Sequence, residues 1–354
     1  MRQVLSRAQR ALRLGGALAF LALSVHGCDS GSSLDTSQGP PPDSTPPDTT
    51  TPTPPDTTPP PDTTTPPPPP PDTTTAPSGD CARVEPSTVQ PHHQGIAMGP
   101  LHSPRSKFDA YSGNQITAIT PLCLLADLDA ARRANMRTFI SFTGNEQYIR
   151  DVNGFSFTKW KERVDRFGGI DLTPYIEDGT ILGHILMDEP NDPHNWSGKR
   201  VTQAQIEEMA KYSKEVWPTM TTYIRTFPEY LLGGQYPHLD ALWFHYLDRF
   251  APLDGFIAKH FADVRALGLK IIAGLNVVNG GSKDSGIPGR GPNKYGMSAA
   301  EIREWGGRLM AEPDLCAFVL YEYDEQYMSR PDIKAAIEEL AEKARNFPTR
   351  NCAR

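Results

Sequence analysis

The chain has 354 residues, 35 of them proline, and its formal net charge at pH 7 is -7. Residues 81–354 hold 31 basic and 34 acidic side chains, so this part of the chain carries no basic field. Because phosphate neutralisation supplies most of the affinity for nucleic acid, this charge balance argues against a nucleic-acid partner. We expect a monomer.

The first 27 residues have the pattern of an export signal. Arginine occupies four of the first 13 positions, and residues 14–25 form an apolar segment that is too short to span a bilayer. The segment closes with Val25-His26-Gly27-Cys28, which resembles the lipobox of bacterial lipoproteins, although His26 departs from the usual small or hydroxyl residue. The resemblance implies cleavage before Cys28, lipidation of its thiol, and a protein anchored to a bacterial membrane on the periplasmic or cell-surface side. The alternative is an ordinary signal peptide that is cleaved elsewhere.

Residues 28–80 differ in composition from everything that follows. They consist mostly of Pro, Thr, Ser and Asp, contain no Lys or Arg, and repeat the sequence Pro-Pro-Asp-Thr-Thr in degenerate form. Such a segment cannot bury enough apolar surface to offset the entropy lost on ordering. We predict a disordered tether that could hold the following domain roughly 100 Å or more from a lipid anchor.

From residue 81 onward, short apolar segments alternate with amphipathic ones. Strands are predicted at residues 95–99 and 138–142, and helices at residues 124–136 and 158–167. Residues 180–188 form an apolar run with no polar alternation, which is typical of a parallel strand that is buried on both faces. This run ends in acidic residues.

The second half continues the alternation. Thr202 and Gln205 form a capping-box pattern at the start of a helix that runs to residue 216. Strands are predicted at residues 220–226, 241–247, 270–277 and 317–323, with helices at residues 254–267, after Ser298, and from Pro331. We count seven strands and expect an eighth between residues 149 and 175. Repeated strand and helix units of this total length predict a single (β/α)₈ barrel over residues 81–354. A doubly wound sheet is the alternative, but no Gly-x-Gly-x-x-Gly sequence follows the first strand, so no cofactor is expected.

The four cysteines beyond Cys28 favour disulfides, because an exported chain meets an oxidising environment. Cys81 and Cys352 bracket the domain, and we predict that they pair because the termini of a closed barrel meet. The pairing of Cys123 and Cys316 is left open.

Polar side chains gather at the carboxyl ends of the predicted strands, which in a barrel converge on one mouth. Two carboxyl groups across such a mouth are the minimum apparatus of glycoside hydrolysis, and Glu189 and Glu322 form the natural pair. Asp324 and Glu325 are competitors for the second role. The expected substrate-binding residues are Asn145, Asp188, Asn191, Trp196, Arg225, His245, Tyr246, Asn276, Tyr321, Tyr323 and Asp324.

The sequence Asp188-Glu189-Pro190-Asn191 resembles the Asn-Glu-Pro motif of clan A glycoside hydrolases. The resemblance implies a retaining (β/α)₈ enzyme in which Glu189, on the fourth strand, is the acid/base and Glu322, on the seventh, is the nucleophile. Asp188 departs from the motif, since it stands where the clan places an Asn that binds the sugar 2-hydroxyl. A second acid beside Glu189 would raise the pKa of one of the two carboxyls.

Several residues have alternative interpretations. Trp196 is the best candidate for a sugar-stacking platform. The Gly- and Pro-rich residues 279–296 are typical of a functional lid or a disordered insertion. A metal-dependent hydrolase would need His92 and His93 to join Asp188, Glu189 and His245, but the two histidines precede the first strand, so no metal is expected. The third possibility is a barrel that binds glycan or cell wall without catalysis.

Overall fold

The computed structural model describes residues 87–250 and 252–354. The predicted signal peptide (1–27), the predicted tether (28–80), Cys28 and Cys81 lie outside the described residues. No helix within the described ranges is both long and apolar enough to cross a membrane.

Eight parallel strands form one sheet, and the chain is a (β/α)₈ barrel. The sheet order begins at β1 and ends at β2, and a parallel bridge between Leu101 and Gln115 brings these two edges together. All seven predicted strands are present. In chain order the eight are β1 (Ala97–Pro100), β2 (Gly113–Thr117), β3 (Arg137–Ser141), β6 (Ile181–Asp188), β7 (Thr222–Arg225), β8 (Ala241–Tyr246), β9 (Lys270–Asn276) and β12 (Leu315–Tyr321).

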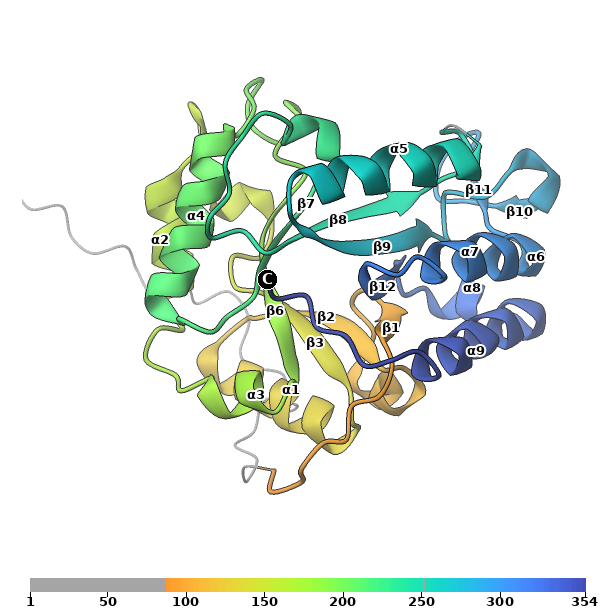
Figure 1. The fold of residues 1–354 in the computed structure, drawn as a ribbon, viewed down its shortest axis with the longest axis horizontal. Helices are drawn as coiled ribbons and strands as arrows, with labels where there is room; N and C mark the ends of the chain where they lie inside the picture. The colour runs from red at the N-terminus through yellow and green to blue at the C-terminus, as the bar shows by residue number, and fades with distance from the viewer. Residues whose placement is uncertain (1–86, 251) are drawn as a thin grey trace, which may run out of the picture. The chain divides into compact units, whose positions relative to one another are not determined.

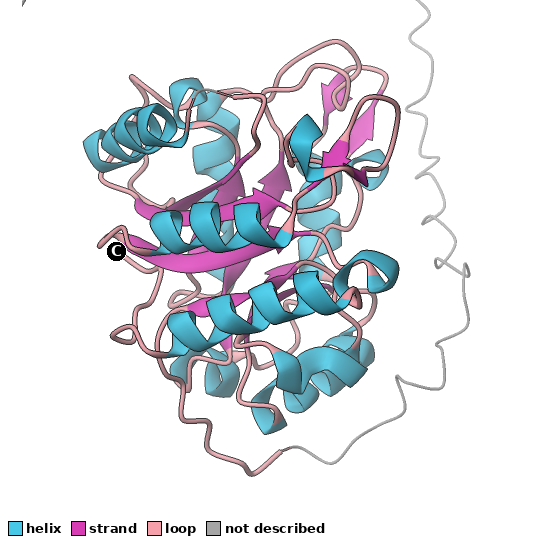
Figure 2. Ribbon diagram, turned by 90° about the vertical axis from the view of Figure 1, so that its right-hand side faces the viewer, coloured by secondary structure: helices cyan, strands magenta, loops and turns pink. Residues whose placement is uncertain are grey.

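Helices cover the outside of the barrel (Figures 1 and 2). The predicted capping box of Thr202 and Gln205 is present at the start of α4. The helices are α1 (Pro121–Arg133), α2 (Phe157–Asp165), α3 (Thr173–Glu177), α4 (Gln203–Val216), α5 (Leu253–Ala266), α6 (Ala299–Glu301), α7 (Gly307–Met310), α8 (Glu325–Met328) and α9 (Pro331–Arg345). Two short hairpins lie outside the barrel sheet, β4 (Arg150–Asp151) with β5 (Gly154–Phe155) and β10 (Ile287–Pro288) with β11 (Tyr295–Gly296).

The eighth strand is not where the sequence pattern placed it. Residues 149–175 hold the β4–β5 hairpin and two helices, whereas the missing barrel strand is β2. Its sequence, Gly-Asn-Gln-Ile-Thr, has no apolar run, because Asn114 and Gln115 are buried in a polar network and Gln115 accepts a hydrogen bond from Tyr223 at 3.1 Å. With this strand counted, Glu322 follows the eighth strand, whereas the clan A resemblance implied the seventh. The seventh strand, β9, ends at Asn276.

The strands alternate between two separate cores. Inward side chains such as Phe139, Tyr223 and Trp243 fill the barrel, while their neighbours along each strand pack against the helices. This alternation decides which residue at a strand end can reach the mouth.

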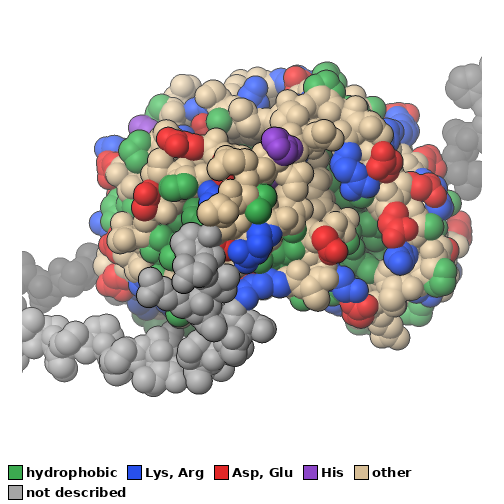
Figure 3. Space-filling model, turned by 90° about the horizontal axis from the view of Figure 1, so that it is seen from below, with side chains coloured by type: hydrophobic (Ala, Val, Ile, Leu, Met, Phe, Trp, Pro, Cys, Tyr) green, Lys and Arg blue, Asp and Glu red, His purple; other side chains and the backbone are tan. Residues whose placement is uncertain are grey.

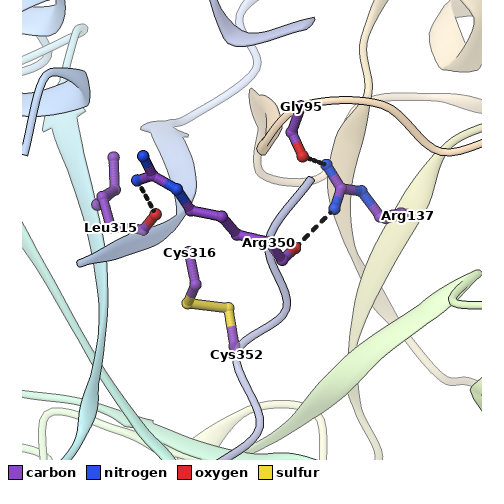
Figure 4. The surroundings of a disulfide bond; sticks show 6 residues. All are labelled: Gly95, Arg137, Leu315, Cys316, Arg350 and Cys352. Atoms are coloured by element: carbon purple, nitrogen blue, oxygen red, sulfur yellow. Dashed lines mark hydrogen bonds between the residues drawn. A yellow bond between two sulfur atoms is a disulfide. The ribbon is translucent and has the colours of Figure 1, made fainter. Parts of the chain in front are cut away.

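The prediction that Cys352 pairs with Cys81 is wrong, because Cys352 forms a disulfide with Cys316 (Figure 4). The C-terminal segment runs across the amino end of the barrel. The Arg350 side chain donates to the Leu315 carbonyl at 2.8 Å, and the Arg350 carbonyl accepts from Arg137 at 2.9 Å. These contacts bring the segment to the start of β12, where Cys316 lies. Cys123 is also disulfide-bonded.

Candidate active site

The acidic end of β6 is organised around one buried cation. Arg225, at the end of the neighbouring strand β7, donates to Asp188 Oδ2 at 2.6 Å and to Glu189 Oε1 at 3.0 Å. The Arg225 side chain is only 11% exposed, and it lies over the indole ring of Trp243 at 5.0 Å. Asp188 is held by the same guanidinium nitrogen through both of its carboxylate oxygens. Arg225 therefore pairs with two acids and also lines a pocket at the mouth, where it was expected.

The backbone of Glu189 is held on both sides. Its amide donates to the Arg225 carbonyl at 2.9 Å, and its own carbonyl accepts from the Trp196 indole nitrogen at 2.9 Å. Between these bonds Glu189 has a φ of 42°, in the left-handed region that non-glycine residues rarely adopt. Such conformations persist where surrounding contacts enforce them, and they occur frequently at functional sites.

Trp196 is not a sugar platform. Its side chain is completely buried and packs edge-on against Phe155 at 5.8 Å, so although the residue borders a pocket beside Glu322, it offers no exposed ring face on which a sugar could stack. The sequence around Trp196 shows no core pattern because the residue lies in a loop, and a loop side chain can be buried without any periodicity. Its hydrogen bond makes it a positioning residue for Glu189.

Glu189 has the electrostatic environment of a proton donor. Burial raises the pKa of its carboxyl above the ordinary value of 4.5, Arg225 lowers this pKa, and Asp188 raises it. The net direction is upward. A raised carboxyl pKa is what a general acid needs in order to keep its proton near neutral pH.

The second carboxylate, Glu322, is held by a different arginine. Arg290, in the loop of residues 279–296, bonds Glu322 and also donates to Asp324 Oδ2 at 2.7 Å. His102, which follows β1, lies 3.4 Å from the other oxygen of Glu322. The loop that was predicted to be a lid therefore contacts the candidate catalytic carboxylate.

The two competitors for the second role have other partners. Asp324 is the N-cap of α8, accepting from the Tyr327 amide at 2.8 Å, and its bond to Arg290 lowers the pKa of its carboxyl. Glu325 bonds the Tyr323 hydroxyl, and both residues line a separate pocket with Lys107. Tyr323, predicted to bind substrate, thus lines a different pocket from the ones that hold Glu189 and Glu322.

Two pockets lie at the carboxyl ends of the strands and share the Trp243 side chain. The first, of about 340 Å³, is lined by Glu189, Arg225 and His245, with Asn191 at its edge. The second, of about 160 Å³, is lined by Asp188, Tyr321 and Glu322, with Asn145 at its edge. The barrel thus brings together most of the predicted residues, with Glu189 and Glu322 in adjacent pockets.

Strand alternation separates His245 from Tyr246. His245 points inward and lines the larger pocket, and burial together with Arg225 and Arg249 lowers its pKa well below the ordinary value. Tyr246, predicted to bind substrate, points outward and packs against Phe256 and Trp305 at 5.1 and 5.2 Å between ring centroids. It cannot reach the mouth from that side of β8.

Two other predicted residues act within loops. Asn276 is 8% exposed and accepts a hydrogen bond from the Asn279 amide at 3.0 Å, so it shapes the start of the loop after β9. Asn191 accepts a hydrogen bond from the Thr226 hydroxyl at 2.8 Å and thereby joins the loops that follow β6 and β7.

His102 is a site residue that the sequence pattern did not indicate, and Trp243, an aromatic residue on a predicted strand, was not among the expected substrate-binding residues. Trp243 precedes His245 by two positions on β8, so the alternation of side chains along a strand places both on the inward face. His102 lies just beyond β1, whose predicted end was too early.

The metal-ligand set considered from the sequence is not assembled. The His92 amide donates to Asn135 at 2.7 Å, beside the amino end of β3 and at the opposite end of the barrel from Asp188. Within the described ranges, Glu229, His260 and Asp263 are the one group of three possible metal ligands that lie close together. Lys259 already bonds the carboxylates of both Glu229 and Asp263, and its Nζ lies 3.1 Å from Asp263 Oδ2.

The sequence matches no protein-family model and no curated protein. The fold is similar to that of an endo-1,4-β-D-mannanase from Thermotoga petrophila RKU-1, with 12% identity, a TM-score of 0.48, and coverage of 71% of this chain and 100% of that one. It is also similar to a GH18 chitinase from Pseudoalteromonas aurantia, with 12% identity, a TM-score of 0.42, and coverage of 69% and 98%. At these identities and TM-scores, the similarities do not indicate which reaction this chain carries out.

Proposed function

We propose that this protein is a glycoside hydrolase in which Glu189 donates a proton to the leaving oxygen and Glu322 is the second carboxylate. The observation that carries the proposal is the environment of Glu189 at the end of the fourth barrel strand. Its backbone is held by Arg225 and Trp196, and burial raises the pKa of its carboxyl. A carboxyl with a raised pKa beside an open pocket suits protonation of a glycosidic oxygen.

Glu322 supplies a carboxylate of opposite character. It is bonded by Arg290 and lies 3.4 Å from His102, so basic groups surround it. A carboxylate in such surroundings can act on the sugar or on a water molecule while Glu189 supplies the proton. The two carboxyls are thus held by different arginines, Arg225 and Arg290, as two separate roles require.

A glycan-binding barrel without catalysis is the second candidate. Both carboxylates are in ion pairs with arginine, and the seventh strand ends in Asn276, where clan A enzymes place their nucleophile. These observations favour a site that binds sugar hydroxyl groups without breaking a bond.

Substitution of Glu189 separates the two candidates. A hydrolase should release reducing ends from polysaccharide or cleave aryl glycosides, and Glu189→Gln should slow natural leaving groups far more than activated aryl ones, since only the former need a proton donor. Glu322→Gln should abolish both activities. Arg345→Gln, on the outer surface of α9, is the matched control and should leave activity unchanged. Binding of polysaccharide with no product from the wild-type protein would favour the binding barrel.

We also propose that Cys28 carries a lipid and that residues 28–80 tether the domain to a bacterial membrane. The Val-His-Gly-Cys sequence and the Pro- and Thr-rich composition support this proposal.

A further inference from the structure

The larger pocket at the mouth contains polar groups that the proposed reaction does not use. Its volume of about 340 Å³ is at the lower end of small-molecule pockets, which begin at about 300 Å³. Besides Glu189 and Arg225, it is lined by Trp243, His245, Arg249 and the aromatic ring of Phe250. It has both an apolar wall and a set of hydrogen-bonding groups, as sugar subsites require.

Two buried nitrogen atoms in this pocket have no hydrogen-bond partner among the described residues. They are the indole Nε1 of Trp243, whose residue is 2% exposed, and Nδ1 of His245, whose residue is 7% exposed. An indole N–H can only donate, so it needs an acceptor from a ligand or from water. Buried polar groups are rarely left without a partner, so these two nitrogens can still hydrogen-bond a ligand or a water molecule that reaches them.

Arg249 adds a positive charge at the edge of the same pocket. Its guanidinium lies 5.7 Å from the Phe250 ring centroid, and it makes no ion pair with the residues that the structure describes. Arg225, the other arginine of the pocket, already bonds Asp188 and Glu189.

The acidic groups of the pocket are hydrogen-bonded in part. Asp192 Oδ1 accepts from the His194 amide at 2.9 Å and lies 3.0 Å from the His194 ring, and Glu189 Oε1 is bonded by Arg225. The low pKa of His245 keeps its ring neutral, so it adds no charge of its own. The groups that can donate to a ligand are the Trp243 indole, the neutral His245 imidazole and the Arg249 guanidinium.

We propose that this pocket is the subsite for a sugar that carries a carboxylate, with Arg249 and the Trp243 N–H binding the carboxylate oxygens and His245 binding a ring hydroxyl. The inference rests on the proposed function for its substrate class, but binding can be measured without turnover. A carboxylate supplies acceptors for both donors and a charge for Arg249, which a neutral sugar does not.

The experiment is a calorimetric titration of the wild-type protein with glucuronate, galacturonate and mannuronate, each compared with glucose, galactose and mannose. At least one uronate should bind about tenfold more tightly than its neutral counterpart, and added salt should reduce this preference. Arg249→Gln should remove the preference and leave the neutral sugar unaffected, while Trp243→Phe should weaken the uronate. Arg345→Gln removes a charge elsewhere and should change nothing.

The inference is overturned if neutral sugars bind as tightly as their uronates, if Arg249→Gln keeps the preference, or if none of the six sugars binds. Hydrolysis assays keep the two proposals separate. Cleavage of neutral polysaccharides with no preference for acidic ones would leave the hydrolase standing and remove the uronate subsite. Tight uronate binding with no cleavage of any polysaccharide would support the uronate subsite and contradict the hydrolase.

Discussion

Arg225 and Glu189, at the ends of neighbouring strands, are joined twice. The Arg225 guanidinium lies 3.0 Å from the Glu189 carboxylate, and the Glu189 amide donates to the Arg225 carbonyl at 2.9 Å. The side-chain bond places a cation beside the proposed acid, and the backbone bond holds the unusual conformation of that acid. Arg225 therefore determines both the backbone position of Glu189 and the charge beside its carboxyl.

Arg225→Gln should lower the free energy of unfolding by about 1–3 kcal/mol. This value lies between that of exposed ion pairs and that of fully buried ones, because the arginine is buried while Asp188 and Glu189 are 38% and 42% exposed. Urea denaturation at neutral pH measures the change. Arg345→Gln, which breaks an exposed pair with Glu342, should cost clearly less. Equal costs for the two variants would contradict the role of Arg225.

Activity should fall as the pH rises through the raised pKa of Glu189, because only the protonated carboxyl can donate. The sign for stability is the same, since a carboxyl pKa that is raised by folding contributes stability at low pH that is lost as pH increases. Arg225 lowers this pKa, so in Arg225→Gln the falling limb should move to higher pH. The pH dependence of kcat/KM measures the fall in activity and its shift in Arg225→Gln. A limb that remains unchanged in Glu189→Gln would assign it to another group.

The anomeric configuration of the product should be inverted. Retention, which the clan A resemblance implies, needs carboxyls about 5 to 5.5 Å apart, whereas inversion needs roughly 6.5 to 9.5 Å. Strands β6 and β12 are opposite in the order of eight, and Glu189 and Glu322 line different pockets. Both observations favour the wider spacing. Proton NMR of the first-formed product measures its anomeric configuration. A retained anomer would contradict this prediction and support the retaining mechanism that the clan A resemblance implies.

Removing the disulfide between Cys316 and Cys352 should lower the melting temperature. The two residues are 36 positions apart, and closing a loop of that length stabilises a protein by about 3–4 kcal/mol in the chain-entropy model. Calorimetry of the Cys316→Ser/Cys352→Ser double variant measures the loss. Peptide mapping of the unreduced protein should recover the two cysteines in one linked peptide, and a peptide linking Cys352 to another cysteine would contradict the structure.

Cys28→Ala should release the protein from membranes while the barrel remains folded, because the anchor lies outside the residues that form the barrel. Detergent partitioning and circular dichroism of the same preparation check the two halves of this expectation. Partitioning that does not change would remove the lipoprotein proposal.

The sequence alone determined the alternation of strands and helices, because burial on both faces of a parallel strand requires a continuous apolar run. It also determined that Asp188 and Glu189 follow such a strand and so lie at the carboxyl end of the barrel. Both are local properties, visible within one segment. The strand β2 could not be recognised within its own segment, because its Asn114 and Gln115 are buried by partners far away in the chain.

Only the tertiary structure decided which side chains share a space. Trp196 is buried beneath Glu189, Tyr246 faces the helices, and Cys352 reaches Cys316, although nothing in the neighbouring residues indicates these outcomes. Each depends on a contact between residues that are distant in sequence, or on the face to which a strand turns its side chain. With β2 counted, Glu322 follows the eighth strand, whereas the resemblance implied the seventh, because the position of a carboxylate around a barrel depends on every strand that precedes it.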